Sequence, residues 1–300
     1  MKIITLTLSP AFDVHCYAPT FEACRENLAT VTARDVGGKG VNVSRALTEN
    51  GVENTAIVVL GEENAADFRS ALAKEGLHTR EILVAGRIRE NITIHTDHTA
   101  ETRLSFKGFF ADETLLGRVE QAIGEVDEDT IVTLTGRLPE GIKMQDVQAF
   151  LLRLREKGAR LVIDSRSFSL SDLIEARPWL IKPNEEEIVA YVRDSADLSD
   201  AARVLHGKGI ANVMISMGAR GACLACSEGT FEAKPPHVAA LSTIGAGDSS
   251  IAGFLMATAN GKGASEALRT AVAFGTAACL TEGTKPPTPD VVASILSAVS

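Results

Sequence analysis

The stretch "TIVTLTGRLPEGIKMQDVQAFLLRLREKGARLVIDS" (residues 130–165) indicates how this 300-residue chain folds. Two short aliphatic segments, 130–136 and 159–165, have the composition of buried strands, and residues 144–157 between them have the apolar spacing of a helix. Short aliphatic strands that alternate with helices usually form a parallel sheet that is covered on both faces. The stretch therefore predicts a strand–helix–strand unit of an α/β protein.

The same alternation continues on both sides of this unit. Further strands are expected at residues 2–8, 55–60 and 212–218. Further helices are expected at residues 41–50, 65–75, 115–123, 249–259, 264–279 and 290–299. The composition, 45% hydrophobic but only 5% aromatic residues, suits one large aliphatic core. We therefore predict the α/β fold class and a single domain over residues 1–300.

Two segments, 12–35 and 87–107, interrupt this alternation. They lack helical periodicity and carry alternating β-type residues, as in "ENITIHT" (90–96) and "TRLSF" (102–106). They are interpreted as strands outside the main sheet. If the two segments pair, they form a small β-sheet lid, and such lids usually cover a ligand at the carboxyl ends of parallel strands.

Charge and cysteine usage exclude several classes of protein. The net charge of −9 argues against a broad nucleic-acid or anionic-membrane surface, so a phosphate site would have to be local. No segment reaches the roughly 18 apolar residues of a membrane-spanning helix, and residues 2–8 are typical of a strand rather than a signal peptide. Five scattered cysteines suit reduced thiols in the cytoplasm, and Cys223 and Cys226 are interpreted as buried strand residues rather than a zinc or redox site.

Two glycine-rich motifs, "GGKGVN" (37–42) and "GAGD" (245–248), each precede an expected helix. Backbone N–H groups at a helix start are unpaired, so both motifs could present donors to a ligand, and the loop at 245–248 is a candidate anion site. The patterns of P-loop enzymes and dinucleotide dehydrogenases are absent from the sequence. On local pattern alone, Asp248 either caps the following helix or acts chemically beside a bound anion.

Seven motifs along the chain resemble those of the ribokinase-like (PfkB) carbohydrate kinases, over almost the whole length. They are "LSPAFD" (8–13), "GGKGVNVSRAL" (37–47), "RENITI" (89–94), "TGRLP" (135–139), "IKPNEEE" (181–187), "SMGARGA" (216–222) and "STIGAGDSSIAGF" (242–254). The chain is most similar to the branch of 1-phosphofructokinases and tagatose-6-phosphate kinases. This resemblance implies a three-layer ribokinase-like fold, with a central, mostly parallel sheet flanked by helices and a small β-sheet lid.

The resemblance also implies an activity: ATP- and Mg²⁺-dependent phosphorylation of a ketohexose phosphate to the bisphosphate. Fructose 1-phosphate is the expected substrate, and tagatose 6-phosphate is the alternative. A kinase of an unphosphorylated sugar or nucleoside is a further alternative, which Arg89 and Arg103 disfavour. A sugar-phosphate-binding protein without catalysis belongs to another class, and the carboxylate of Asp248 disfavours it. A homodimer formed through the lid is expected, because lid strands have exposed edges.

The functional residues follow from the same resemblance, position by position. Asp248 is implied to take the proton from the sugar hydroxyl, while the backbone of Gly245, Ala246 and Gly247 holds the transferred phosphoryl group. The implied substrate-binding residues are Asp13, Gly38, Lys39, Asn42, Arg89, Asn91, Arg103 and Arg137, of which Arg89 and Arg103 hold the sugar phosphate. The implied nucleotide-binding residues are Lys182, Asn184, Ser216, Gly218, Gly221, Thr243, Gly245 and Gly247.

Asn184 and Glu187 are further implied to order magnesium through water. They are three residues apart, so on a helix they would share one face. Without the resemblance, the same residues are equally typical of a charged helix start.

Three departures from the family pattern concern the identity of the sugar. Leu28 stands where a basic residue is common, and Arg25 is the nearest substitute. Arg137 stands where serine is usual, and "DSRSFSL" (164–170) replaces a D-[ST]-S-G motif. We hypothesise that Arg137 supplies the phosphate contact missing at Leu28; the alternative is that its side chain extends into solvent.

Overall fold

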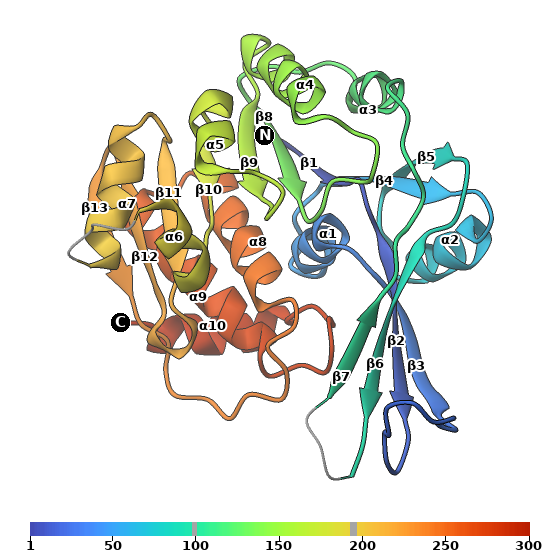
Figure 1. Ribbon diagram of the computed structural model, residues 1–300. Coiled ribbons are helices and arrows are strands. Elements are labelled where there is room, and N and C mark those ends of the chain that lie inside the picture. Colours follow the sequence, from blue (N-terminus) through green and yellow to red (C-terminus); the bar gives the residue numbers. More distant parts are fainter. Residues whose placement is uncertain (98–100, 193–196) are drawn as a thin grey trace.

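The computed structural model describes residues 1–97, 101–192 and 197–300, and Figure 1 shows its ribbon. The stretch 130–165 forms strand β8 (Thr130–Thr135), helix α4 (Met144–Glu156) and strand β9 (Arg160–Asp164). Strands β8 and β9 pair in parallel, with Thr133 beside Val162. The strand–helix–strand prediction is therefore confirmed.

This unit lies within a nine-stranded sheet of order β13-β12-β11-β10-β9-β8-β1-β4-β5. Its other strands are β1 (Lys2–Thr7), β4 (Thr55–Gly61), β5 (Thr79–Val84), β10 (Leu180–Ile181), β11 (Asn212–Ser216), β12 (Ala222–Cys226) and β13 (Gly229–Ala233). All neighbours from β11 to β5 pair in parallel, whereas β12 is antiparallel to both β11 and β13. The prediction of a mostly parallel sheet is confirmed.

Helices cover both faces of this sheet. One face packs against α3 (Leu115–Ile123), α4, α5 (Leu170–Ala176), α6 (Glu185–Tyr191) and α7 (Leu198–Gly207). The other face packs against α1 (Lys39–Glu49), α8 (Ala246–Ala259), α9 (Ala264–Ala278) and α10 (Pro289–Ala298). Successive strand residues point to opposite faces of the sheet, so Ile4 packs against the helices of the first face and Ile3 against those of the second. The three-layer α/β architecture is thus confirmed.

The two interrupting segments form a second sheet of order β3-β2-β6-β7. Its strands are β2 (Ala11–Tyr17), β3 (Thr30–Gly37), β6 (Arg89–His95) and β7 (Thr102–Ser105). They extend away from the main body in Figure 1. The base of this small sheet is buried, where Phe12 packs edge-on against Phe68 of α2 (Ala65–Lys74) with ring centroids 5.3 Å apart. Most of β3 is exposed, and β3 and β7 are its edge strands.

Some elements were not predicted from the sequence, namely α5, α7, β5, β10 and β13. Strand β10 has only two residues, which is too short for any periodicity. All five cysteines are free thiols, and Cys223 and Cys226 are buried in β12, as expected for strand residues. Within the described ranges, no helix combines the length and the apolar character needed to cross a bilayer.

Candidate active site

Asp248 lies in the first turn of α8 but does not cap it. The residue before the helix is Gly245, in the left-handed region at φ 80°, and no side chain makes a capping hydrogen bond there. Asp248 is only 6% exposed, and its Oδ2 accepts a hydrogen bond from Asn42 Nδ2 at 2.8 Å. The capping interpretation is therefore wrong, because the carboxylate points to α1 rather than back to its own helix start.

The environment of Asp248 raises the pKa of its carboxyl group. Burial raises the pKa of its carboxyl to about 6, with a further upward effect of Asp164, while Lys39, Asn42 and Lys182 act in the opposite direction. A carboxylate with a pKa close to the working pH suits proton transfer, since it is ionised and still accepts a proton readily.

A cluster of charges surrounds this carboxylate. Asp164, at the carboxyl end of β9, is buried and accepts a hydrogen bond from Lys39 Nζ at 2.9 Å, and Lys182 Nζ lies 3.8 Å from the same oxygen. Burial favours the neutral acid, but Lys182 and Lys39 outweigh it and lower the pKa of Asp164. Lys182 Nζ also lies 3.0 Å from the position of a Cβ at Gly247, so glycine permits close approach of the ammonium to the backbone of α8.

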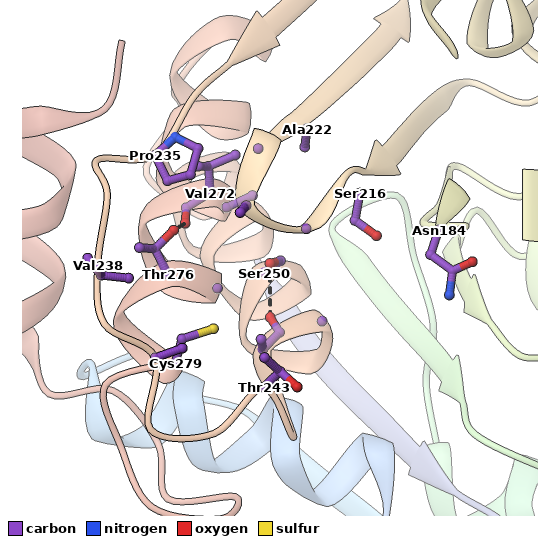
Figure 2. A pocket seen from close by; sticks show the side chains of 18 of the residues that line it. Asn184, Ser216, Ala222, Pro235, Val238, Thr243, Ser250, Val272, Thr276 and Cys279 are labelled. Carbon is purple, nitrogen blue, oxygen red and sulfur yellow. Dashed lines mark hydrogen bonds between the residues drawn. The ribbon is translucent and has the colours of Figure 1, made fainter. Parts of the chain in front are cut away.

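A large cavity of about 660 Å³ opens beside the start of α8. Figure 2 shows side chains from the α8 and α9 region, from the ends of β11 and β12 and from residues 235–243 around it. Seven of the expected nucleotide-binding residues line it, namely Lys182, Asn184, Ser216, Gly218, Gly221, Thr243 and Gly247. Gly245 does not line the cavity but directly precedes α8. On the apolar side of the cavity, Pro235 and Val238 were not predicted.

A smaller cavity of about 270 Å³ lies against the small sheet. Five of the expected substrate-binding residues line it: Asp13, Arg89, Asn91, Arg103 and Arg137. Gly38, Lys39 and Asn42 do not line it, and they lie at the start of α1, where Lys39 contacts Asp164 and Asn42 contacts Asp248. The loop before α8 borders both cavities, because Thr243 lines the large one and Ile244 the small one.

The small cavity contains a cationic side chain with a free donor. Arg89 Nη1 donates to Asn91 Oδ1, and Asn91 Nδ2 donates to Asp13 Oδ1, both at 2.8 Å. Arg89 Nε is buried and has no hydrogen-bond partner among the described residues. Burial lowers the pKa of Arg89, and the positive charge of Arg137 lowers it further. Two guanidinium groups that repel each other around a buried free donor form a favourable site for an anion.

The other arginines considered for the sugar phosphate are more exposed than Arg89. Arg103 is exposed and already interacts with Glu101 at 3.6 Å and with Thr93 Oγ1 at 3.4 Å. Arg25, the expected substitute for Leu28, pairs with Glu22 at 3.2 Å and does not line the small cavity. Arg137 is exposed overall, yet it borders this cavity and influences Arg89.

Asn184 and Glu187 do not present free oxygens to a metal. Asn184 is not on the face of α6 but is its capping residue: its side chain accepts from Glu187 N, and Glu187 Oε2 accepts from Asn184 N at 3.1 Å. Arg166 Nε donates to the other carboxylate oxygen at 2.7 Å. The described residues contain no group of three His, Cys, Asp or Glu side chains that could coordinate a metal.

Sequence reasoning did not identify Asp164 as a site residue. Its position gave a usable signal, because an acidic residue that ends a buried aliphatic strand lies where ligands of parallel sheets bind. Its contacts with both lysines could not be predicted, because Lys39 begins α1, Asp164 ends β9 and Lys182 follows β10, and these elements are distant in the sequence.

Comparisons with known proteins place the chain in one family. Residues 11–291 match the model of the pfkB family of carbohydrate kinases. The 1-phosphofructokinase of Escherichia coli strain K12 is 31% identical over 277 residues, which cover 91% of this chain and 89% of that protein. The ATP-dependent 6-phosphofructokinase isozyme 2 of the same strain is 30% identical over 292 residues, which cover 95% of this chain and 94% of that protein.

The fold agrees with these sequence relationships. The crystal structure of phosphofructokinase-2 from Escherichia coli in complex with fructose-6-phosphate matches with a TM-score of 0.90 at 28% identity, covering 99% of this chain and 98% of that chain. The chain therefore belongs to the pfkB family of carbohydrate kinases, which transfer a phosphoryl group to an alcohol acceptor.

Proposed function

We propose that this kinase transfers the γ-phosphoryl group of ATP to a hydroxyl of fructose 1-phosphate and so produces fructose 1,6-bisphosphate. One observation carries the proposal: the buried carboxylate of Asp248 lies at the start of α8, and the loop before it borders both a large cavity and an arginine-lined one. The names of the relatives support a fructose phosphate as the acceptor. Tagatose 6-phosphate is the alternative acceptor.

In this proposal each cavity holds one substrate. ATP occupies the large cavity, with its phosphates toward the backbone N–H groups of Gly245, Ala246 and Gly247 at the start of α8 and toward Lys182. The sugar occupies the small cavity, where Asp13 accepts hydrogen bonds from sugar hydroxyls and Asn91 can accept or donate them. Arg89 binds the phosphate of the sugar.

The residues around the transferred group then have distinct tasks. Asp248 accepts the proton of the attacking hydroxyl, and the backbone donors of α8 stabilise the charge that spreads over the phosphoryl oxygens. A bound magnesium ion would neutralise phosphate charge, and Asn184 and Glu187 would hold its waters. The remaining expected residues, Ser216, Gly218, Gly221 and Thr243, would contact the nucleotide.

We also propose that residues 1–300 act as one domain whose small sheet is a lid over the sugar. Asp13, Arg89 and Arg103 of this sheet line the small cavity, so a sugar bound there contacts the lid directly. The lid has exposed apolar side chains on its strands and just after β7, namely Val31, Leu104 and Phe106. A homodimer that pairs two lids would cover these side chains and the free strand edges.

An assay of ADP release with a panel of acceptors tests the proposed function. Fructose 1-phosphate should give the highest kcat/KM, above fructose 6-phosphate and tagatose 6-phosphate, and unphosphorylated fructose should be a poor substrate. A higher value for tagatose 6-phosphate would reassign the acceptor. Thermal stabilisation by a sugar phosphate without ADP release for any acceptor would instead identify a binding protein without catalysis.

Replacement of Arg137 by serine tests which end of the sugar carries the bound phosphate. If Arg137 contacts the phosphate, Arg137→Ser should lower kcat/KM for fructose 1-phosphate by about tenfold, with a different factor for fructose 6-phosphate and tagatose 6-phosphate. Kinetics with the three acceptors, in the parent and in the variant, measure this. Changes below about threefold for all three, smaller than the loss of one charged contact, would assign Arg137 to solvent.

A further inference from the structure

Arg45 is a buried arginine of α1 that lies behind the candidate base. It is 7% exposed. Its guanidinium forms a two-point ion pair with Glu75, with Nε and Nη2 each 2.7 Å from a carboxylate oxygen. Nη2 also donates to the carbonyl oxygen of Val36 at 2.8 Å. The remaining terminal nitrogen, Nη1, donates to Asn42 Oδ1 at 3.0 Å.

These contacts determine the orientation of the Asn42 amide. The amide oxygen accepts from Arg45, and the amide nitrogen donates to Asp248 Oδ2 at 2.8 Å. An arginine side chain is only a donor, and an ionised carboxylate is only an acceptor. The reversed amide would therefore place its N–H₂ group against the guanidinium and its oxygen against the carboxylate, so both contacts would become repulsive. Only one orientation of Asn42 satisfies both neighbours.

We propose that Arg45 is a positioning residue for proton transfer: it fixes the Asn42 amide so that this amide always donates to Asp248. The inference rests on the proposed function, in which Asp248 is the base. With Oδ2 held by Asn42, the other carboxylate oxygen remains available to the substrate hydroxyl. Glu75, the C-cap residue of α2, holds the guanidinium of Arg45 in turn. The contacts therefore run from the end of α2 through α1 to α8.

The orientation of Asn42 also influences the acidity of the base. Lys39 and Lys182 favour the ionised form of Asp248, Asp164 opposes it, and the hydrogen bond from Asn42 favours it. An amide that is free to rotate would present its oxygen to Asp248 for part of the time, which favours the protonated acid. Loss of Arg45 should therefore raise the pKa of Asp248. Because the protonated acid cannot accept a proton, the low-pH limb of kcat/KM should move to higher pH.

The pH dependence of kcat/KM in Arg45→Met tests this inference. The limb, expected near pH 6 in the parent, should move upward by about one pH unit, so that kcat/KM falls about tenfold on the acid side of the limb and about twofold at pH 7, while the KM for ATP stays unchanged. Arg69→Met is the matched control, because it removes another arginine–glutamate pair of α2, with Glu81, that has no contact with this chain of residues. The control should keep the parent profile.

Two further variants make the test decisive. Arg45→Lys keeps the charge but cannot hold Glu75 and Asn42 together, so it should shift the limb in the same direction; it replaces Arg45→Met if that variant does not fold. In an Asn42→Leu background, Arg45→Met should cause no additional shift, because no amide remains to be oriented. A folded Arg45 variant with the parent profile would overturn the inference, provided that Asp248→Asn is inactive. An active Asp248→Asn would instead overturn the proposed function.

Discussion

Replacement of Asp248 by asparagine is expected to lower kcat by about 10²- to 10⁴-fold, the contribution of a positioned general base. Asparagine has nearly the same shape, so the packing at the start of α8 should survive, but its amide cannot accept the proton of the sugar hydroxyl. Because Asp248 does not line the large cavity, the KM for ATP should stay close to that of the parent. Steady-state kinetics of ADP release, with a thermal melt as a check of folding, measure both effects.

The matched control is Asp146→Asn. Asp146 is the third residue of α4, as Asp248 is the third residue of α8, but it is exposed and its helix packs on the opposite face of the main sheet. A carboxylate in the first turn of a helix contributes about 0.3–1 kcal/mol through the helix dipole, so both variants lose that small contribution to stability. Only Asp248→Asn should lose activity. Retention of more than about a tenth of the parent kcat would exclude Asp248 as the base.

Arg89→Ala is expected to raise the KM for the sugar phosphate by about 10- to 100-fold, which corresponds to the roughly 1.5–3 kcal/mol of a charge-assisted contact. Arg89 should matter more than Arg103, because its Nε is buried without a partner in the described part of the chain, whereas Arg103 already interacts with Glu101. The KM for ATP should not change, since Arg89 lines only the small cavity.

Two comparisons decide whether this effect comes from the phosphate. Arg87→Ala removes an exposed arginine of the same segment that pairs with Glu90 and lines neither of the two cavities, so it should resemble the parent. With unphosphorylated fructose, Arg89→Ala should also resemble the parent. A similar loss with fructose and with its phosphate would indicate that Arg89 maintains the shape of the cavity through Asn91 rather than binding phosphate.

The predictable part of the fold depends on periodicity within single elements. Helix α3, residues 115–123, was located without error, because its apolar residues recur at helical spacing over several turns and face the core. Strand β5 was missed because it is an edge strand with mostly polar or exposed residues, so its apolar signal is weak. Helix α5 has only seven residues; its capping box, Ser169 with Asp172, was the one signal that could have revealed it.

The candidate site was predictable where a motif lies on one element and unpredictable where elements meet. The order of the motifs identified the loop at 245–248 and part of the lining of the two cavities, but it missed Pro235 and Val238. Sequence spacing could not show that Asp248 is bonded to Asn42, which is 206 positions away, because that contact follows from the packing of α1 against α8. The contact between Asn42 and Arg45 is local by comparison, since the two residues are three positions apart on α1.

The pairing of β2 with β6 has a consequence for the entropy of folding. Strands β2 and β3 are close in sequence, but Asp13 contacts Asn91 across 78 positions, which include α1, β4, α2 and β5. Closing a longer loop costs more conformational entropy, so contacts of this range slow folding. We expect the small cavity to take shape late in folding, so that a partly folded chain presents no complete cavity for the proposed sugar.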